Sequence, residues 1–243
     1  MLKVQINGDI EWAIKAGGSS LDIPRDLAVD AADNVYVVGA FYGASDFGGD
    51  DVVTNNDVHN GFVAKASSAG EWEWVEKIGT DGYESEASLI RSIEGDSTVI
   101  PPEEGSIYIS GYFRVRAQIG SENFNTGLGS TSSELFIARM EHDGDWQWAR
   151  YRGNQSTHGE KPTAMDVDQN GRMYVFGDST GEVDIYQQDF ESVGDYGFPP
   201  GWYSNWNNNS CPNSSARAHG VRQHNKPGNN TRDFFISGVP QYN

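Results

Sequence analysis

The sequence predicts an all-β fold built from a repeated four-stranded unit. A glycine followed four residues later by tryptophan occurs three times, at residues 8–12 (GDIEW), 70–74 (GEWEW) and 144–148 (GDWQW). A hairpin pattern with alternating apolar residues occupies 27–39 and returns at 164–177 and, more loosely, at 89–111. No long stretch has the 3.6-residue apolar period of a helix. We therefore expect strands and no helix.

Four strand types follow one another in a fixed order. Types A and B form the hairpin, as in residues 27–30 (LAVD) and 34–39 (NVYVVG). Type C is typified by residues 61–66 (GFVAKA), and type D is the strand that contains the paired tryptophans. The opening residues 2–6 (LKVQI) take the type C place before Gly8. The chain then reads C-D, A-B-C-D, A-B-C-D, A-B-C, which predicts thirteen strands.

The length and order of these units favour one architecture. The spacing is 62 residues from Trp12 to Trp74 and 74 residues from Trp74 to Trp148. Four-stranded antiparallel units of this size, each needing its neighbours to cover its faces, indicate a β-propeller. A β-sandwich is the alternative, but it would not need the same unit in the same order. We expect a single propeller domain over residues 1–243, with repeats at 8–69, 70–143 and 144–243.

A family resemblance rests on four motifs of the first repeat: residues 16–19 (AGGS), 27–30 (LAVD), 34–39 (NVYVVG) and 62–65 (FVAK). With these motifs, residues 8–69 resemble the bacterial β-propeller repeat family known as SBBP and, more distantly, NHL repeats. Repeat two departs by an insertion at 99–104 (VIPPEE), and repeat three has only Gly153 where repeat one has a glycine pair. The resemblance implies a propeller fold and brings no established catalytic signature.

The third repeat contains a long insertion at residues 187–232. From the last glycine of its B strand, Gly177, to Phe235 in the C motif at 234–239 (FFISGV), it spans 58 residues, against 23 and 25 in the first two repeats. A long loop on one blade is where a propeller would place individual function. We therefore expect the contact surface of the protein to include this insertion.

The number of blades predicts an unfinished ring. Closed propellers typically have about four to eight blades, and this chain supplies material for about three. Open sheet edges invite pairing with other chains. One hypothesis is a homo-oligomer or larger assembly, for example two copies in a six-bladed ring in which each N-terminal D strand completes the partner's last blade. The other is that the chain is a fragment of a longer propeller.

Charge and hydropathy exclude some partners. The net charge of −18 repels nucleic acid and anionic membrane surfaces, so we expect neither as a partner. No apolar run approaches the roughly 20 residues that span a bilayer, so no membrane insertion is expected. A signal-peptide core is missing, because Lys3, Gln5 and Asn7 interrupt the N-terminus. An extracellular, cell-surface or virion location is the expectation, with the missing signal peptide against simple export.

Two metal sites can be formulated from the sequence. Asp166, Asp168 and Asn170 fit the first half of a calcium loop, but Gly177 stands where such a loop has its bidentate glutamate. A hairpin turn stabilised by these side chains is the competing interpretation and the favoured one. The second site would hold zinc between Cys211, His219 and His224, and their loose spacing argues against it. No cofactor is therefore expected, with calcium as the one candidate.

The insertion also contains a candidate ligand-binding group. Trp202, Tyr203 and Trp206 could stack on sugar rings while Asn207 and neighbouring asparagines bind the hydroxyls. The alternative, which we favour, is that these aromatic residues anchor the loop to the propeller.

Catalysis has little support, because the G-x-S-x-G and H-E-x-x-H motifs are both missing. We therefore predict a non-catalytic interaction or structural module that contacts a glycan or a protein through the blade-three loop. Two alternatives stay open: a structural subunit of a virion or extracellular assembly, and a glycan-active enzyme that uses the central channel.

Overall fold

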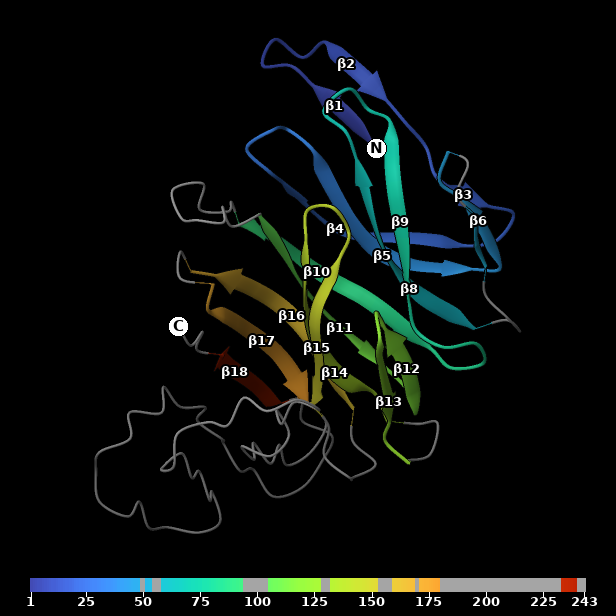
Figure 1. Ribbon diagram of the computed structural model, residues 1–243, viewed down its shortest axis with the longest axis vertical. Coiled ribbons are helices and arrows are strands. Elements are labelled where there is room, and N and C mark those ends of the chain that lie inside the picture. Colours follow the sequence, from blue (N-terminus) through green and yellow to red (C-terminus); the bar gives the residue numbers. More distant parts are fainter. Residues whose placement is uncertain are drawn as a thin grey trace.

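The computed structural model describes residues 1–48, 51–53, 58–93, 105–127, 132–152, 159–168, 171–179 and 233–239. Within these ranges every regular element is a β-strand, as the sequence predicts, and the strands form stacked antiparallel sheets (Figure 1). A helix able to cross a membrane is absent from this part of the chain. The insertion at 99–104 in the A–B turn of repeat two lies outside the described residues.

Blade one is a four-stranded antiparallel sheet in the strand order β4-β5-β8-β9. Its strands are β4 (Asp22–Val29), β5 (Val35–Tyr42), β8 (His59–Ala66) and β9 (Trp72–Ile78). They correspond to types A, B, C and D in that order. The chain order and the spatial order are therefore the same, which is the meander of a propeller blade.

Blades two and three repeat this arrangement. Blade two has the order β10-β11-β14-β15, formed by β10 (Ser85–Ile93), β11 (Ser106–Phe113), β14 (Glu134–Glu141) and β15 (Trp146–Arg152). Blade three consists of β16 (Glu160–Val167), β17 (Met173–Ser179) and β18 (Asp233–Val239). Among the described residues blade three thus has the types A, B and C, as predicted.

The three blades have the same strand register, including the same β-bulge. The A strand has a bulge at the same place in each blade, between Pro24 and Asp26, between Ala87 and Leu89, and between Pro162 and Ala164. The B-strand glycine always pairs with the phenylalanine of the C strand, as in Gly39 with Phe62 and Gly111 with Phe136. This agreement shows that the sheets are copies of one structural unit.

The recurring glycine is required by the bulge beside it. A Cβ atom on Gly39 would lie 2.2 Å from the carbonyl oxygen of Ile23, and one on Gly111 would lie 2.0 Å from that of Glu86. Both distances are far below van der Waals contact. The bulged A strand therefore approaches the B strand so closely that only glycine fits.

Each blade covers the face of the blade before it. The A strand β10 packs against blade one, where Ile90 belongs to the same apolar cluster as Tyr36, Val38 and Val63. In the same way, β16 packs against blade two, and Met165 shares a cluster with residues Tyr108, Leu135 and Ile137. The core therefore lies between the sheets, as in a propeller.

A two-stranded sheet precedes blade one. It consists of β1 (Leu2–Val4) and β2 (Ile10–Ala13), which are the predicted C and D strands at the N-terminus. All thirteen predicted strands are thus present in the described residues.

Five further short strands in the described residues were not predicted. β3 (Gly17–Gly18), β6 (Ala44–Asp46) and β7 (Asp51–Val53) form one small sheet, and β12 (Arg116–Ile119) and β13 (Glu122–Asn125) form a hairpin. Strands of two to four residues are too short to show a period in the sequence. β6 with β7 in blade one, and β12 with β13 in blade two, turn the B–C connection into a small hairpin, and β3 precedes the A strand of blade one.

Candidate binding face

The connections between B and C strands lie at the same end of the strands in all three blades. At this end β5 and β8 meet at the pair Tyr42 and His59, and β11 and β14 meet at Phe113 and Glu134. β17 and β18 meet there too, so residues 180–232 leave and return at the same end. We call this end the B–C face. The predicted blade-three insertion is therefore attached to it at both of its ends.

The predicted ligand-binding residues themselves lie outside the described residues. These are Trp202, Tyr203, Trp206 and Asn207, together with the zinc candidates Cys211, His219 and His224. Their roles stay predictions, and the geometry of this face comes from the inner strands.

A chain of polar contacts crosses from blade one to blade two at the B–C face. The Tyr42 hydroxyl and His59 Nδ1 share a hydrogen bond of 2.9 Å, and His59 Nε2 lies 3.5 Å from the Tyr112 hydroxyl. Tyr112 in turn donates to Glu86 Oε2 over 3.5 Å. The side chains come from β5, β8, β11 and β10, so the contacts join two adjacent sheets.

Charged side chains from the A strands complete this cluster. Arg25 Nη2 donates to Glu86 Oε2 over 2.7 Å, and Ser88 Oγ donates to Oε1 of the same carboxylate over 3.2 Å. Lys161 Nζ lies 3.8 Å from the centre of the Tyr112 ring, within cation–π distance. Glu86 is buried, whereas Arg25 is partly exposed. We call these six residues with Ser88 the inner polar cluster.

Burial keeps the side chains of His59 and Tyr112 neutral. It lowers the pKa of His59, although the carboxylates of Glu84 and Glu86 act in the opposite direction. Burial also raises the pKa of Tyr112 to about 12, and here Glu86 and Glu84 add to the effect. At neutral pH the imidazole and the phenol therefore act as uncharged hydrogen-bonding groups beside the cations of Arg25 and Lys161. These contacts join adjacent blades and fix the side chains at the B–C face.

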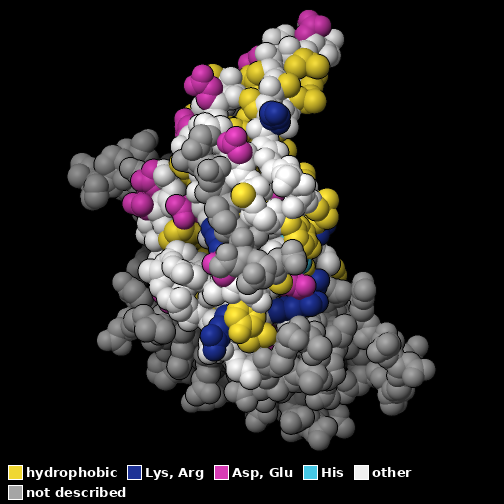
Figure 2. Space-filling view, turned by 90° about the vertical axis from the view of Figure 1, so that its right-hand side faces the viewer, with side chains coloured by type: hydrophobic (Ala, Val, Ile, Leu, Met, Phe, Trp, Pro, Cys, Tyr) yellow, Lys and Arg dark blue, Asp and Glu magenta, His cyan; other side chains and the backbone are white. Residues whose placement is uncertain are grey.

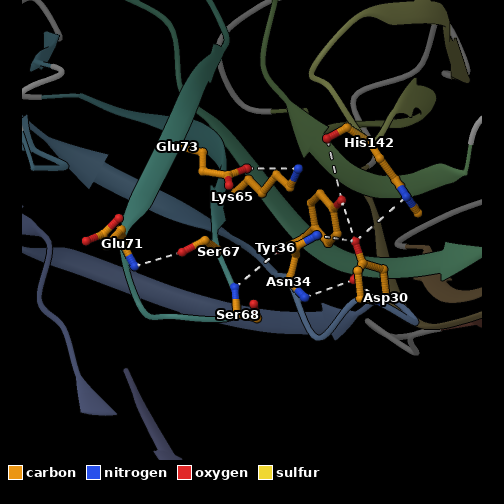
Figure 3. Close-up of polar contacts among 10 residues, drawn as sticks. Asp30, Asn34, Tyr36, Lys65, Ser67, Ser68, Glu71, Glu73 and His142 are labelled. Atoms are coloured by element: carbon orange, nitrogen blue, oxygen red, sulfur yellow. Dashed lines mark hydrogen bonds and ion pairs between the residues drawn. The ribbon is translucent and has the colours of Figure 1, made fainter.

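A second polar group closes the A–B turn of blade one (Figure 3). The backbone N–H groups of Ala32 and Asn34 each donate to Asp30 Oδ1 over 2.9 Å. Asn34 Nδ2 and the Tyr36 hydroxyl donate to Oδ2 over 2.9 Å and 3.0 Å. His142 of blade two approaches the same carboxylate, with Nδ1 3.8 Å from Oδ2. Asp30 is buried and fixes the turn against the next blade.

The predicted calcium loop has the same construction in blade three. Asp168 Oδ1 accepts from the Arg172 backbone over 2.9 Å, and the Tyr174 hydroxyl lies 3.4 Å from Oδ2. Asp166 accepts from the N–H of Val167, and Asn170 lies outside the described residues. Asp168 thus serves the turn as Asp30 does. No cluster of three or more potential metal ligands occurs in the described part of the chain, and calcium binding stays a prediction.

Sequence reasoning missed the inner polar cluster, although the repeat contained a signal for it. By register, Glu86 and Tyr112 of blade two occupy the places of Ile23 and Ala40 in blade one. A polar pair at a position that is apolar in the neighbouring repeat indicates a site-specific role. The signal could be found only after the repeats had been aligned through the bulge.

Comparison with known proteins supports the architecture at a coarse level. No protein-family model matches the chain. An uncharacterized WD repeat-containing protein of Acanthamoeba polyphaga mimivirus is 23% identical over 171 residues, which cover 63% of this chain and 12% of that protein. The chain therefore spans a small part of this relative's length. The distant similarity supports β-propeller repeats in general, and the more specific resemblance to SBBP repeats stays a prediction.

The relative also bears on the class of function. WD-repeat propellers are typically interaction modules that bind proteins, and they are usually non-catalytic scaffolds. Together, the repeated four-stranded sheets and this distant similarity indicate a β-propeller repeat domain.

Proposed function

We propose that the chain is a non-catalytic interaction module that binds a protein partner through the B–C face. The observation that supports this most is convergence: the long insertion is attached at the face where the inner polar cluster lies. A rigid propeller with one enlarged loop presents that loop in a fixed position. The net charge of −18 favours a partner with a basic contact surface.

A glycan is the second candidate ligand for the same face. Its support is the composition of the insertion, with Trp202, Tyr203 and Trp206 beside Asn207. A module of this kind would work outside the cell or on a cell or virion surface. A structural subunit of a virion or extracellular assembly is the remaining candidate role. It is supported by exposed apolar side chains on the first and the last blade.

Exchanging the insertion tests the proposed face. Residues 180–232 are replaced by 114–133, which make the same B–C connection in blade two and so suit the pairing of β17 with β18. Wild type and exchange variant are then compared on a glycan array and against peptides selected from a displayed library. Circular dichroism and thermal melting provide the folding control.

The proposal expects the exchange variant to bind the ligands of the wild type with an affinity that is lower by about tenfold or more, which corresponds to about 1.4 kcal/mol. Loss of glycan binding in Trp202→Ala and Trp206→Ala would show that the ligand is a glycan and that these tryptophans bind it. Equal binding of all ligands to both proteins would refute the proposed face. Turnover of a polysaccharide by the wild type would instead support the glycan-active enzyme.

A further inference from the structure

The first blade exposes apolar side chains that the later blades bury. Leu27 of β4 is 51% exposed, whereas its equivalents by register, Ile90 of β10 and Met165 of β16, are 0% and 4% exposed. Ile90 and Met165 are covered because each packs on the blade before it. Val29 of β4 is exposed to the same extent as Leu27. Among the described residues, no blade covers Leu27 and Val29 as blade one covers Ile90.

The β1–β2 hairpin reproduces the outer half of a blade. Lys3 pairs with Trp12 as Lys65 pairs with Trp74 in blade one, and both hairpins shift register directly after the lysine. The lysine forms the same ion pair in both, to Glu11 at 3.3 Å in β2 and to its equivalent at 2.9 Å in β9. By these criteria β1 and β2 are a C strand and a D strand.

The hairpin also stands where the outer half of a preceding blade would stand. Trp12 lies against Gly70, the turn glycine of blade one, and Trp74 lies against Gly144, the corresponding glycine of blade two. Trp12 Nε1 additionally donates to the carbonyl oxygen of Ser68 over 2.9 Å. The β1–β2 hairpin is thus stacked on blade one as the outer half of blade one is stacked on blade two.

The inner edge of this half blade is open. In blades one and two the C strand pairs with a B strand on one side and a D strand on the other, but within the described part of the chain β1 pairs only with β2. Leu2 and Val4 of β1 are 56% and 50% exposed, whereas their equivalents Ala64 and Ala66 are fully buried. Figure 2 shows hydrophobic side chains at this narrow upper end of the molecule. An unpaired strand edge flanked by apolar side chains is a template for strand addition.

We propose that the leading face, formed by the free edge of β1 and by Leu2, Val4, Leu27 and Val29, binds a two-stranded β-hairpin of the A–B type. The inner hairpin would complete the half blade: its B strand pairs antiparallel with β1, and its side chains cover Leu27 and Val29. This inference specifies a partner for the proposed interaction module and rests on that function. It uses a different surface from the B–C face.

A hairpin fits this face better than a second copy of the chain does. The A–B hairpin of blade three is already paired with β18, so another copy would bring a C strand into the place that β1 occupies. The same mismatch in strand number argues against the two-copy ring expected from the sequence, in which one copy would contribute a single D strand to the last blade of the other. Because β2 is paired with β1, the N-terminal hairpin offers two strands to a blade that lacks one.

The leading face also predicts the character of its partner. Across the junction of blades one and two, Arg25 pairs with Glu86, and Asp26 pairs with Arg91 at 2.8 Å. By register, Ile23 and Ala28 of β4 take the places of Glu86 and Arg91, and both are uncharged. The incoming hairpin should therefore be apolar on its inner side, and its binding should depend little on salt.

A peptide copy of the chain's own inner hairpin provides the test. A labelled peptide of residues 20–43, which contains β4 and β5, is titrated with the full chain by fluorescence anisotropy. Binding is measured for the wild type, for Leu27→Glu, and for Tyr174→Ser, which is a matched control in blade three, the blade farthest from the leading face. Both positions are solvent-exposed, so both variants should fold, which thermal melting checks. A scrambled peptide controls for nonspecific adhesion.

The proposal expects saturable binding that weakens by about tenfold or more in Leu27→Glu and stays unchanged in Tyr174→Ser. Raising the salt from about 50 mM to about 500 mM should change the affinity less than about threefold. Equal affinity for the scrambled peptide, or no saturable binding, would overturn the proposal. Self-association that Leu27→Glu abolishes would overturn it in favour of a second copy. Ligands of the B–C face should bind Leu27→Glu normally, so the two proposals can fail separately.

Discussion

Replacing Asp30 by asparagine should destabilise the protein strongly although it removes only one charge. The carboxylate accepts four hydrogen bonds, from Ala32, from the backbone and side chain of Asn34, and from Tyr36. In Asp30→Asn the remaining oxygen can still serve the two backbone donors. The new amide nitrogen cannot accept from the Asn34 amide or from the Tyr36 hydroxyl.

The expected loss follows from these two missing bonds. A hydrogen bond to a charged acceptor contributes about 1.5–3 kcal/mol, and a buried donor without an acceptor adds its own desolvation cost. The buried Tyr36 hydroxyl retains one partial alternative, the carbonyl oxygen of His142 at 3.5 Å. We therefore expect Asp30→Asn to lower the free energy of unfolding by about 2–4 kcal/mol.

The matched control is the same change in blade three. Asp168 holds an equivalent turn, but its partner Tyr174 is exposed and can turn to water. Asp168→Asn should cost less than about 1 kcal/mol. Urea unfolding followed by circular dichroism at pH 7 compares the two variants. A loss below about 0.5 kcal/mol for Asp30→Asn, or a larger loss for Asp168→Asn, would refute the argument.

Acid provides a second readout for Asp30. Burial raises its pKa, but the hydrogen bonds from Asn34, Tyr36 and Ala32 outweigh burial, and the net pKa is lowered. A carboxyl group with a lowered folded-state pKa contributes stability above its unfolded pKa of about 3.9, and that stability is lost as the pH falls through the folded value. The gap between wild type and Asp30→Asn should therefore narrow below about pH 4. A gap that is constant from pH 7 to pH 3 would contradict this linkage.

Three further outcomes are expected. Val115 has φ 61° where blade one has Gly43 at φ 69°, so Val115→Gly should stabilise the protein by about 1 kcal/mol in thermal melting, and a lower melting temperature would contradict the strain argument. His59 should titrate below pH 6.5 by NMR; because burial favours its neutral form, the stability it contributes is lost as the pH falls through that lowered pKa, and a value above 6.5 would be inconsistent. Gly111→Ala would place Cβ 2.6 Å from the Phe136 ring and should destabilise by about 2 kcal/mol or more in urea, with wild-type stability as the opposing result.

The candidate site was only partly predictable. The sequence indicated that function would be placed at the blade-three insertion, and pairing of β17 with β18 gives that insertion a definite face. It also suggested that Asp168 serves a hairpin turn, which its hydrogen bond to the Arg172 backbone supports. The contacts of His59 with Tyr42 and Tyr112 could not be foreseen, because they join strands of two sheets whose relative position depends on blade packing.

The sequence by itself determined the strand content and order of this protein. Alternating apolar residues, turn glycines and the recurring tryptophans are local signals, and all thirteen strands that they predict are present among the described residues. The tertiary structure alone decided which faces of those strands are covered. Leu27, Ile90 and Met165 occupy equivalent positions in equivalent strands, yet of the three only Leu27 is open to solvent, because the described strands place only the outer half of a blade, β1 and β2, against its sheet. Burial of a strand depends on whether a neighbouring sheet covers it, and the residues of the strand do not encode whether that sheet is present.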